Sequence, residues 1–296
     1  MKFLDINSQD KPILKSINKE IKKIIKKTDF ILGNSTKNFE NSFAKYCGVK
    51  YAAGCGNGTD ALYLAIKSLN LPKQSEVLLP AMSYCSTLFS VIQAGLKPVL
   101  VDLGVNSPNI SVKEIEKKIS KKTKLIILVH LYGQSCDYYS LKKILKSKKI
   151  FIIEDAAQGH GGYDFKTKKK IGAIGDLACF SFYPGKNLGA YGDAGAVVTN
   201  NKNFFNKIQR LRNLGQLRKF DHNMIGYNSR LDTLQAAILL KKLKYLDYNN
   251  NKRKKIGAYY NKFIINKKVT KLNYTEGCVY HQYVIITVKP KLFRLH

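Results

Sequence analysis

Lys186 is the residue of this chain whose surroundings most clearly suit covalent chemistry. It follows an apolar run and a Pro-Gly pair, several glycines lie close to it in the sequence, and no other basic residue is near. A lysine amine in a partly desolvated pocket has a lowered pKa and becomes a nucleophile that can form a Schiff base. A lysine in a surface loop is the alternative, and the apolar and glycine-rich surroundings of Lys186 favour the pocket.

Asp155 lies near the end of another strongly apolar run, residues 149–157. A carboxylate in that position is costly unless a cation or hydrogen-bond donors meet it. It can hold a protonated ring nitrogen, as the pyridinium of a cofactor requires, or it can cap the turn that follows. If the strand continues, the neighbouring Glu154 points to the opposite face of the sheet.

Several other polar residues allow both a binding and a structural interpretation. Gly58 and Thr59 place backbone N–H groups at a helix start, which favours an anion, but Asn57 can make the same segment an ordinary helix cap. Tyr84 can stack on a planar ring or pack in the core. Ser181 can donate to a phosphate or bond to the backbone of its own strand.

The histidines and cysteines do not predict a metal site. His130 and His160 are isolated in the sequence and are interpreted as structural residues, while His281 is ambiguous. None of the six cysteines forms a C-x-x-C pair. They are interpreted as small buried thiols rather than metal ligands or disulfides.

Short apolar runs alternate with amphipathic stretches along the chain, which is typical of parallel strands joined by helices. Helices are expected within 57–71, 86–96, 111–120 and 139–149, and strands within 76–84, 97–103, 124–133, 149–157, 176–184 and 195–200. This pattern predicts an α/β fold with a mostly parallel sheet flanked by helices. Ligands of such sheets bind beyond the carboxyl ends of the strands. Polar residues that follow the strands are therefore expected to converge on one pocket: Gly58, Thr59, Ser83, Tyr84, Asp155, Gln158, Ser181 and Lys186.

The composition narrows the class of function. The 296 residues include 51 Lys and Arg against 20 Asp and Glu, a net charge of +31. Most lysine clusters alternate with apolar residues at helical spacing, so we interpret them as solvated faces rather than a specific nucleic-acid site. The charge can also attract an anionic substrate. No apolar run is long enough to span a bilayer, and the first residues lack the apolar core of a signal peptide, so a cytoplasmic location is expected.

Five motifs, in order between about residues 30 and 285, resemble the DegT/DnrJ/EryC1/StrS family. They are G-N-G-T-D-A-L-x-L-A, P-A-x-S-Y, I-I-E-D-A-A-Q-G-H-G, F-S-F-Y-P-G-K-N-L-G-A-x-G-D and G-Y-N-S-R-L-D. Members of this family are sugar aminotransferases that use pyridoxal phosphate and have the fold type I of aspartate aminotransferase. The resemblance therefore implies this fold and this cofactor.

The resemblance also implies a role for each matching residue. Lys186 is similar to the lysine that binds the cofactor covalently and moves the proton, and Asp155 to the partner of the pyridine nitrogen. Gln158 is similar to the residue beside the 3-hydroxyl of the cofactor, and Tyr84 to the stacking aromatic. The matching phosphate ligands are Gly58, Thr59 and Ser181, together with Asn228, which in the family reaches the phosphate of the neighbouring subunit. A homodimer with shared active sites is implied.

The wording Y-P-G-K-N-L-G-A is most similar to family members that aminate a dTDP-linked 3-keto-6-deoxyhexose. Glutamate is the usual donor, and two half-transaminations in a ping-pong sequence make amino sugars for surface polysaccharides or natural products. Members that act at C4 are an alternative. A related sugar dehydratase has histidine in place of the lysine, so Lys186 argues against it.

The resemblance divides the chain into a large cofactor-binding domain, residues 1–245, and a partial small domain, residues 246–296. Family members usually continue well beyond a strand such as Y-H-Q-Y, at 280–283 here. We therefore expect the small domain to be incomplete and the chain to be a fragment, a frameshifted product or a short form. A non-catalytic remnant or cofactor-binding subunit is the alternative function.

Overall fold

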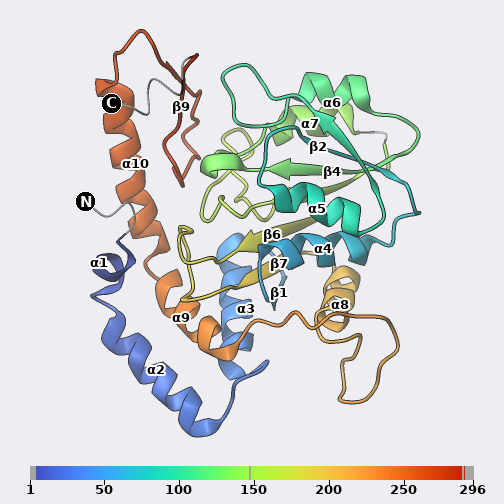
Figure 1. Cartoon of the computed structure of the whole chain (residues 1–296), viewed down its shortest axis with the longest axis vertical. Helices are drawn as coiled ribbons and strands as arrows, with labels where there is room; N and C mark the ends of the chain where they lie inside the picture. The colour runs from blue at the N-terminus through green and yellow to red at the C-terminus, as the bar shows by residue number, and fades with distance from the viewer. Residues whose placement is uncertain (1–4, 147, 289, 291–296) are drawn as a thin grey trace.

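A seven-stranded sheet forms the centre of the protein in the computed structural model, which describes residues 5–146, 148–288 and 290 (Figure 1). The strand order is β1-β7-β6-β5-β4-β2-β3, and only β7 runs antiparallel to its neighbours. The strands are β1 (Tyr51–Cys55), β2 (Glu76–Pro80), β3 (Lys97–Val101), β4 (Thr123–Val129), β5 (Phe151–Asp155), β6 (Leu177–Ser181) and β7 (Gly195–Thr199).

Helices cover both faces of this sheet because alternate residues of each strand point to opposite sides. Leu79 packs in the core beneath α4 (Gly58–Leu69), α5 (Cys85–Gln93) and α8 (Lys202–Leu211), whereas Leu78 packs on the other face. The helices of that second face are α3 (Asn34–Cys47), α6 (Val112–Lys118), α7 (Tyr138–Ile144) and α9 (Thr233–Leu243). The predicted α/β fold with a mostly parallel, doubly covered sheet is confirmed.

The first described helices pack against α9. Helices α1 (Ile6–Asp10) and α2 (Leu14–Lys27) lie on one side, where Ile17 packs against Ile238. The buried carboxylate of Asp10 pairs with Lys242 at 2.8 Å and accepts a hydrogen bond from Tyr191 at 2.9 Å. The first helices thereby hold the end of the loop that carries Lys186.

The C-terminal part of the described chain consists of one long helix and a small ribbon. Helix α10 (Leu246–Phe263) is followed by β8 (Thr270–Lys271) and β9 (Ile285–Ile286), which pair antiparallel. Figure 1 shows α10 along one edge of the molecule with β9 beside it. In the part of the chain that the structure describes, no helix is both long and apolar enough to cross a membrane.

Candidate active site

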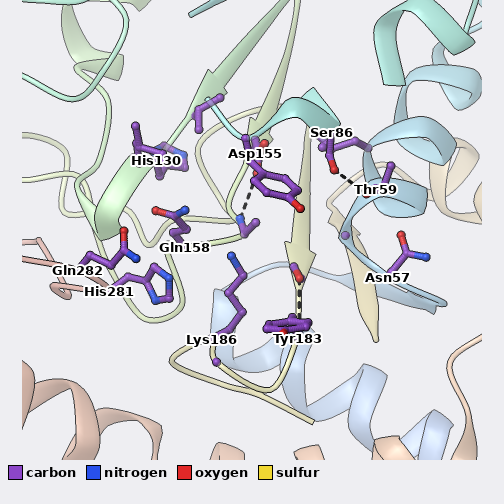
Figure 2. A pocket seen from close by; sticks show the side chains of 18 of the residues that line it. Asn57, Thr59, Ser86, His130, Asp155, Gln158, Tyr183, Lys186, His281 and Gln282 are labelled. Carbon is purple, nitrogen blue, oxygen red and sulfur yellow. Dashed lines mark hydrogen bonds between the residues drawn. The ribbon is translucent and has the colours of Figure 1, made fainter. Parts of the chain in front are cut away.

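A cavity of about 920 Å³ lies at the carboxyl ends of the central strands (Figure 2). Asp155 ends β5 and Ser181 ends β6, so the topology itself brings these two residues to the same edge of the sheet. Seven of the eight predicted cofactor residues line this cavity: Gly58, Thr59, Tyr84, Asp155, Gln158, Ser181 and Lys186. The structure thus gathers residues that are separated by up to 128 positions in the sequence.

One end of the cavity is built to receive an anion. Asn57 caps α4 by accepting a hydrogen bond from the third residue of the helix, so the N–H groups of Gly58 and Thr59 find no acceptor in the described part of the chain. A Cβ on Gly58 would lie 2.6 Å from that of Ser181, so only glycine lets the backbone approach this closely. The hydroxyls of Thr59 and Ser86 lie 2.7 Å apart. Free N–H groups, hydroxyls and the helix dipole together suit a phosphate.

Asp155 combines both interpretations that its sequence allowed. One carboxylate oxygen accepts from the Thr87 hydroxyl at 2.7 Å, and the other accepts from the backbone N–H of Ala157 at 3.2 Å, which caps the turn. The side chain also borders the cavity. Burial raises the pKa of Asp155, while the bonds to Thr87 and Ala157 and the charge of Lys186 oppose the shift. A buried carboxylate with spare acceptor capacity suits a protonated ring nitrogen.

The amide of Gln158 has a defined orientation. Its Oε1 accepts a hydrogen bond of 2.6 Å from the backbone N–H of Tyr132. Tyr132 (φ 58°) and Gly133 (φ 88°) form a left-handed turn that aims this N–H at the amide. With the oxygen occupied, the NH₂ group of Gln158 is left to donate to an oxygen in the cavity.

The amine of Lys186 points from its loop toward the side of the cavity where Asp155 and Gln158 lie (Figure 2). Burial lowers the pKa of Lys186, and the charge of Asp155 opposes this shift. The loop is tightly closed, because a Cβ on Gly189 would lie 2.3 Å from the carbonyl oxygen of Pro184. The isolated lysine of the sequence is therefore half-buried and lines the cavity, as its apolar and glycine-rich surroundings predicted.

A chain of side-chain amides ties the loop after Lys186 to the C-terminal segment. Asn250 donates to the His160 carbonyl at 2.8 Å, and its own oxygen accepts from Asn187 at 2.9 Å. With its NH₂ group so used, Asn187 presents its oxygen to Nδ1 of His281 at 3.0 Å. Nδ1 of His281 must then carry the proton, which leaves the lone pair of Nε2 free. The ambiguous histidine of the sequence thus borders the cavity as a hydrogen-bond acceptor.

The other two singled-out histidines are fully buried, although His130 also lines the cavity. His130 bonds Glu154 at 2.9 Å through Nε2 and accepts from the N–H of Cys136 at 3.2 Å through Nδ1, which fits its structural interpretation. His160 is fully buried against Phe180 and Phe182. Burial lowers the pKa of His160 to about 3, so this ring is neutral at physiological pH.

Three predicted residues stand apart from the others. Ser83, which was expected at the same pocket, does not line the cavity, and its hydroxyl instead donates to the carbonyl of Tyr84 at 3.2 Å. Tyr84 lines the cavity, but its side chain is 71% exposed, so it does not pack in the core. Asn228 does not line the cavity of its own chain and instead pairs through its backbone with Asn213. The sequence reasoning also missed Thr87 and Arg253. Thr87 is one residue of an amphipathic helix, and Arg253 lies in the run K-R-K-K, so neither carried a signal of its own.

Comparisons with known proteins agree on the relationship of this chain. Residues 12–292 match the DegT/DnrJ/EryC1/StrS aminotransferase family. The dTDP-3-amino-3,6-dideoxy-alpha-D-galactopyranose transaminase of Aneurinibacillus thermoaerophilus is 40% identical over 99% of this chain and 81% of its own length. The UDP-2-acetamido-2-deoxy-3-oxo-D-glucuronate aminotransferase of Pseudomonas aeruginosa is 38% identical over 88% of this chain and 72% of its own. The crystal structure of Streptomyces venezuelae DesV with a ketimine intermediate has a TM-score of 0.95 and 33% identity, covering all of this chain and 80% of DesV.

Proposed function

The chain belongs to the DegT/DnrJ/EryC1/StrS aminotransferase family, and we propose that it transfers an amino group from glutamate to a nucleotide-linked keto-sugar. The relatives at 36–40% identity and the DesV structure support a sugar aminotransferase that depends on pyridoxal phosphate. The observation that carries the proposal is the half-buried amine of Lys186, which lines the same cavity as Asp155 and the N–H groups and hydroxyls at the start of α4. Such an arrangement is what this cofactor requires of a protein.

The residues around the cavity fit pyridoxal phosphate at each of its polar groups. Gly58, Thr59 and Ser181 would hold the phosphate, Asp155 the ring nitrogen and Gln158 the 3-hydroxyl. Tyr84 would stack on the ring, and Lys186 would bind it covalently. When bound, the cofactor supplies an electron sink for the carbon that loses and gains the proton.

The chain's own residues then handle the protons. The carboxylate of Asp155 would keep a proton on the ring nitrogen through a charge-assisted hydrogen bond, and the hydroxyl of Thr87 fixes the orientation of that carboxylate. Because desolvation lowers the pKa of Lys186, more of its amine is neutral near pH 7 and can accept a proton and return it. The amide of Gln158 is oriented by the backbone N–H of Tyr132, and its NH₂ group would hold the 3-hydroxyl oxygen in place.

The finer identity of the substrate is part of the same proposal. We favour a dTDP-linked 3-keto-6-deoxyhexose as acceptor, because the relative at 40% identity is a dTDP-3-amino-3,6-dideoxyhexose transaminase. The reaction would follow a ping-pong sequence with glutamate as donor. The reaction would take place in the cytoplasm, and its product would be an amino sugar for surface polysaccharides. We further propose that the chain is divided into a cofactor-binding domain, residues 1–245, and a partial small domain, residues 246–296.

A homodimer with shared active sites is supported by the segment around Asn228. Leu217, Phe220 and Ile225 in this segment are 52%, 82% and 89% exposed, an unusual set of apolar side chains for a free surface. A second copy of the chain would cover them. In that arrangement Asn228 would reach the phosphate of the neighbouring subunit, which accounts for its place outside the cavity of its own chain.

Borohydride reduction of the protein loaded with pyridoxal phosphate tests the proposal. We expect a visible absorbance band that reduction removes, and a pyridoxyl group on the peptide that contains Lys186. A Lys186→Ala variant should lose both signals. Lys202→Ala, which removes an exposed lysine at the start of α8, should keep them. A folded wild-type protein that shows no band would contradict the proposed function.

A further inference from the structure

The wall of the cavity formed by the C-terminal segment carries a cation without a counter-charge. We call this wall, made of Arg253, His281 and Gln282, the C-terminal wall. Arg253 comes from α10, is half-buried, and donates only one long hydrogen bond of 3.5 Å, to the His281 carbonyl. It takes part in none of the ion pairs that the described residues form.

Other buried cations of this protein are treated differently. Arg212 bonds the carboxylate of Glu40 and a backbone carbonyl, and Lys242 bonds Asp10 at 2.8 Å. A buried charge is normally paired in this way because its desolvation is costly. Burial lowers the pKa of Arg253, yet a guanidinium stays protonated in proteins. Arg253 therefore keeps a partly desolvated positive charge, and most of its five N–H donors are available to a partner that comes from outside the chain.

The neighbours of Arg253 in the cavity make an anion the appropriate partner. Burial, together with the charges of Lys186 and Arg253, lowers the pKa of His281 to about 3, so this ring remains neutral and adds no charge. The position of His281 also indicates where the anion would bind. His281 and Gln282 lie on one side of Lys186, whereas Asn57 and Thr59, at the proposed phosphate end of the cavity, lie on the other side (Figure 2).

We propose that Arg253 binds an anionic group of a substrate, namely a carboxylate of the amino donor. This inference rests on the proposed function. A donor that reacts beside Lys186 carries its carboxylates within a few bonds of the reacting amine, which matches a cation on the adjacent wall. The guanidinium can hold a carboxylate through two parallel hydrogen bonds. The diphosphate of a sugar nucleotide is also an anion that an arginine can bind, but the sugar ring separates it from the keto carbon that reacts beside Lys186.

Calorimetric binding to the protein loaded with pyridoxal phosphate tests this subsite with two probes, glutarate for the donor carboxylates and dTDP for the diphosphate. We expect Arg253→Gln to weaken glutarate binding at least tenfold, about 1.4 kcal/mol, and to change dTDP binding less than twofold. Lys254→Gln is the matched control. It removes one charge from the same turn of α10, but Lys254 lies over Tyr163 and does not line the cavity.

The other outcomes are equally decisive. Weaker dTDP binding with unchanged glutarate binding would overturn the donor assignment and identify the nucleotide as the source of the anion. Equal binding of both probes to wild type and Arg253→Gln, or no glutarate binding to wild type, would overturn the subsite. An unchanged visible band in the variant shows that the protein is folded and loaded. Loss of the band in wild type would instead count against the proposed function.

Kinetics of the separate half-reactions provide a second readout. In Arg253→Gln, the glutamate concentration that gives half of the maximal rate should rise at least tenfold, while the half-reaction with the amino-sugar nucleotide should keep its rate within twofold. Arg253→Lys should lie between wild type and Arg253→Gln, because it keeps the charge but loses the paired hydrogen bonds. An equal loss in both half-reactions would mean a general structural effect and would contradict the proposal.

Discussion

Glu154 and Asp155 are adjacent carboxylates on β5 that serve opposite faces of the sheet. Both are buried. Glu154 accepts hydrogen bonds from three backbone N–H groups, between Gly172 and Gly175, and meets His130 at 2.9 Å. Asp155 accepts only from Thr87 and Ala157, and it borders the cavity. The carboxylate whose acceptor sites are filled holds two segments together, whereas the one with spare capacity is available to a ligand.

The largest effect should come from removing the charge on the cavity side. Asp155→Asn keeps the shape of the side chain but cannot stabilise a protonated ring nitrogen. Loss of one partner of a buried charge pair costs about 3–5 kcal/mol, so we expect transamination to slow by about 10²–10⁴-fold. The free energy of unfolding without cofactor should change little, and single-turnover kinetics with glutamate would measure the loss. A rate within tenfold of wild type would remove Asp155 from the proposed site.

A smaller effect, and one on stability, is expected on the other face. Glu154→Gln places an NH₂ group against backbone N–H donors, so at least one buried donor loses its acceptor. We expect the free energy of unfolding to fall by about 2–4 kcal/mol, as measured in urea. The rate per folded, loaded molecule should stay within about threefold of wild type. A variant with normal stability and a hundredfold lower rate would reverse the assignment of the two carboxylates.

The sequence predicted the residues on the cavity face of the sheet better than the contacts on the opposite face. Lys186, Asp155 and Ser181 follow strands that the apolar runs mark clearly, and the parallel arrangement brings strand ends together. Local pattern also placed Glu154 on the other face. It did not reveal the partners of Glu154, because the N–H groups near residues 172–175 become donors only when that loop folds back over β5.

Contacts between distant segments account for most of what the sequence did not predict. The hydroxyl of Thr87 reaches Asp155 across 68 positions, and the Asn187–His281 bond spans 94. Such contacts depend on how helices pack over the sheet, which no local pattern encodes. Strand β1 was missed for a different reason: its sequence, Y-A-A-G-C, has small residues and a glycine and therefore little strand propensity.

The smallest predicted effect concerns two histidines, His130 and His281, and the pH dependence of the free energy of unfolding. Both His130 and His281 line the cavity. His130 has both nitrogens bonded, one of them to Glu154, whereas His281 has one free nitrogen and a pKa lowered to about 3. In the unfolded chain a histidine titrates near 6.5. Between about pH 6.5 and pH 3 the unfolded state therefore binds more protons at this site, and the free energy of unfolding falls as the pH falls, by less than about 1.4 kcal/mol per pH unit.

This contribution is testable by urea unfolding at a series of pH values, without added cofactor. His281→Gln should show a shallower loss of stability between pH 6.5 and pH 4 than wild type. His222→Gln is the control, because His222 is exposed and lies outside the cavity. Because His281 is only partly buried, solvent screening makes the difference smaller than a full proton would give. Equal slopes in wild type and His281→Gln would mean that this ring is solvated, and the C-terminal wall would then be less desolvated than the site requires.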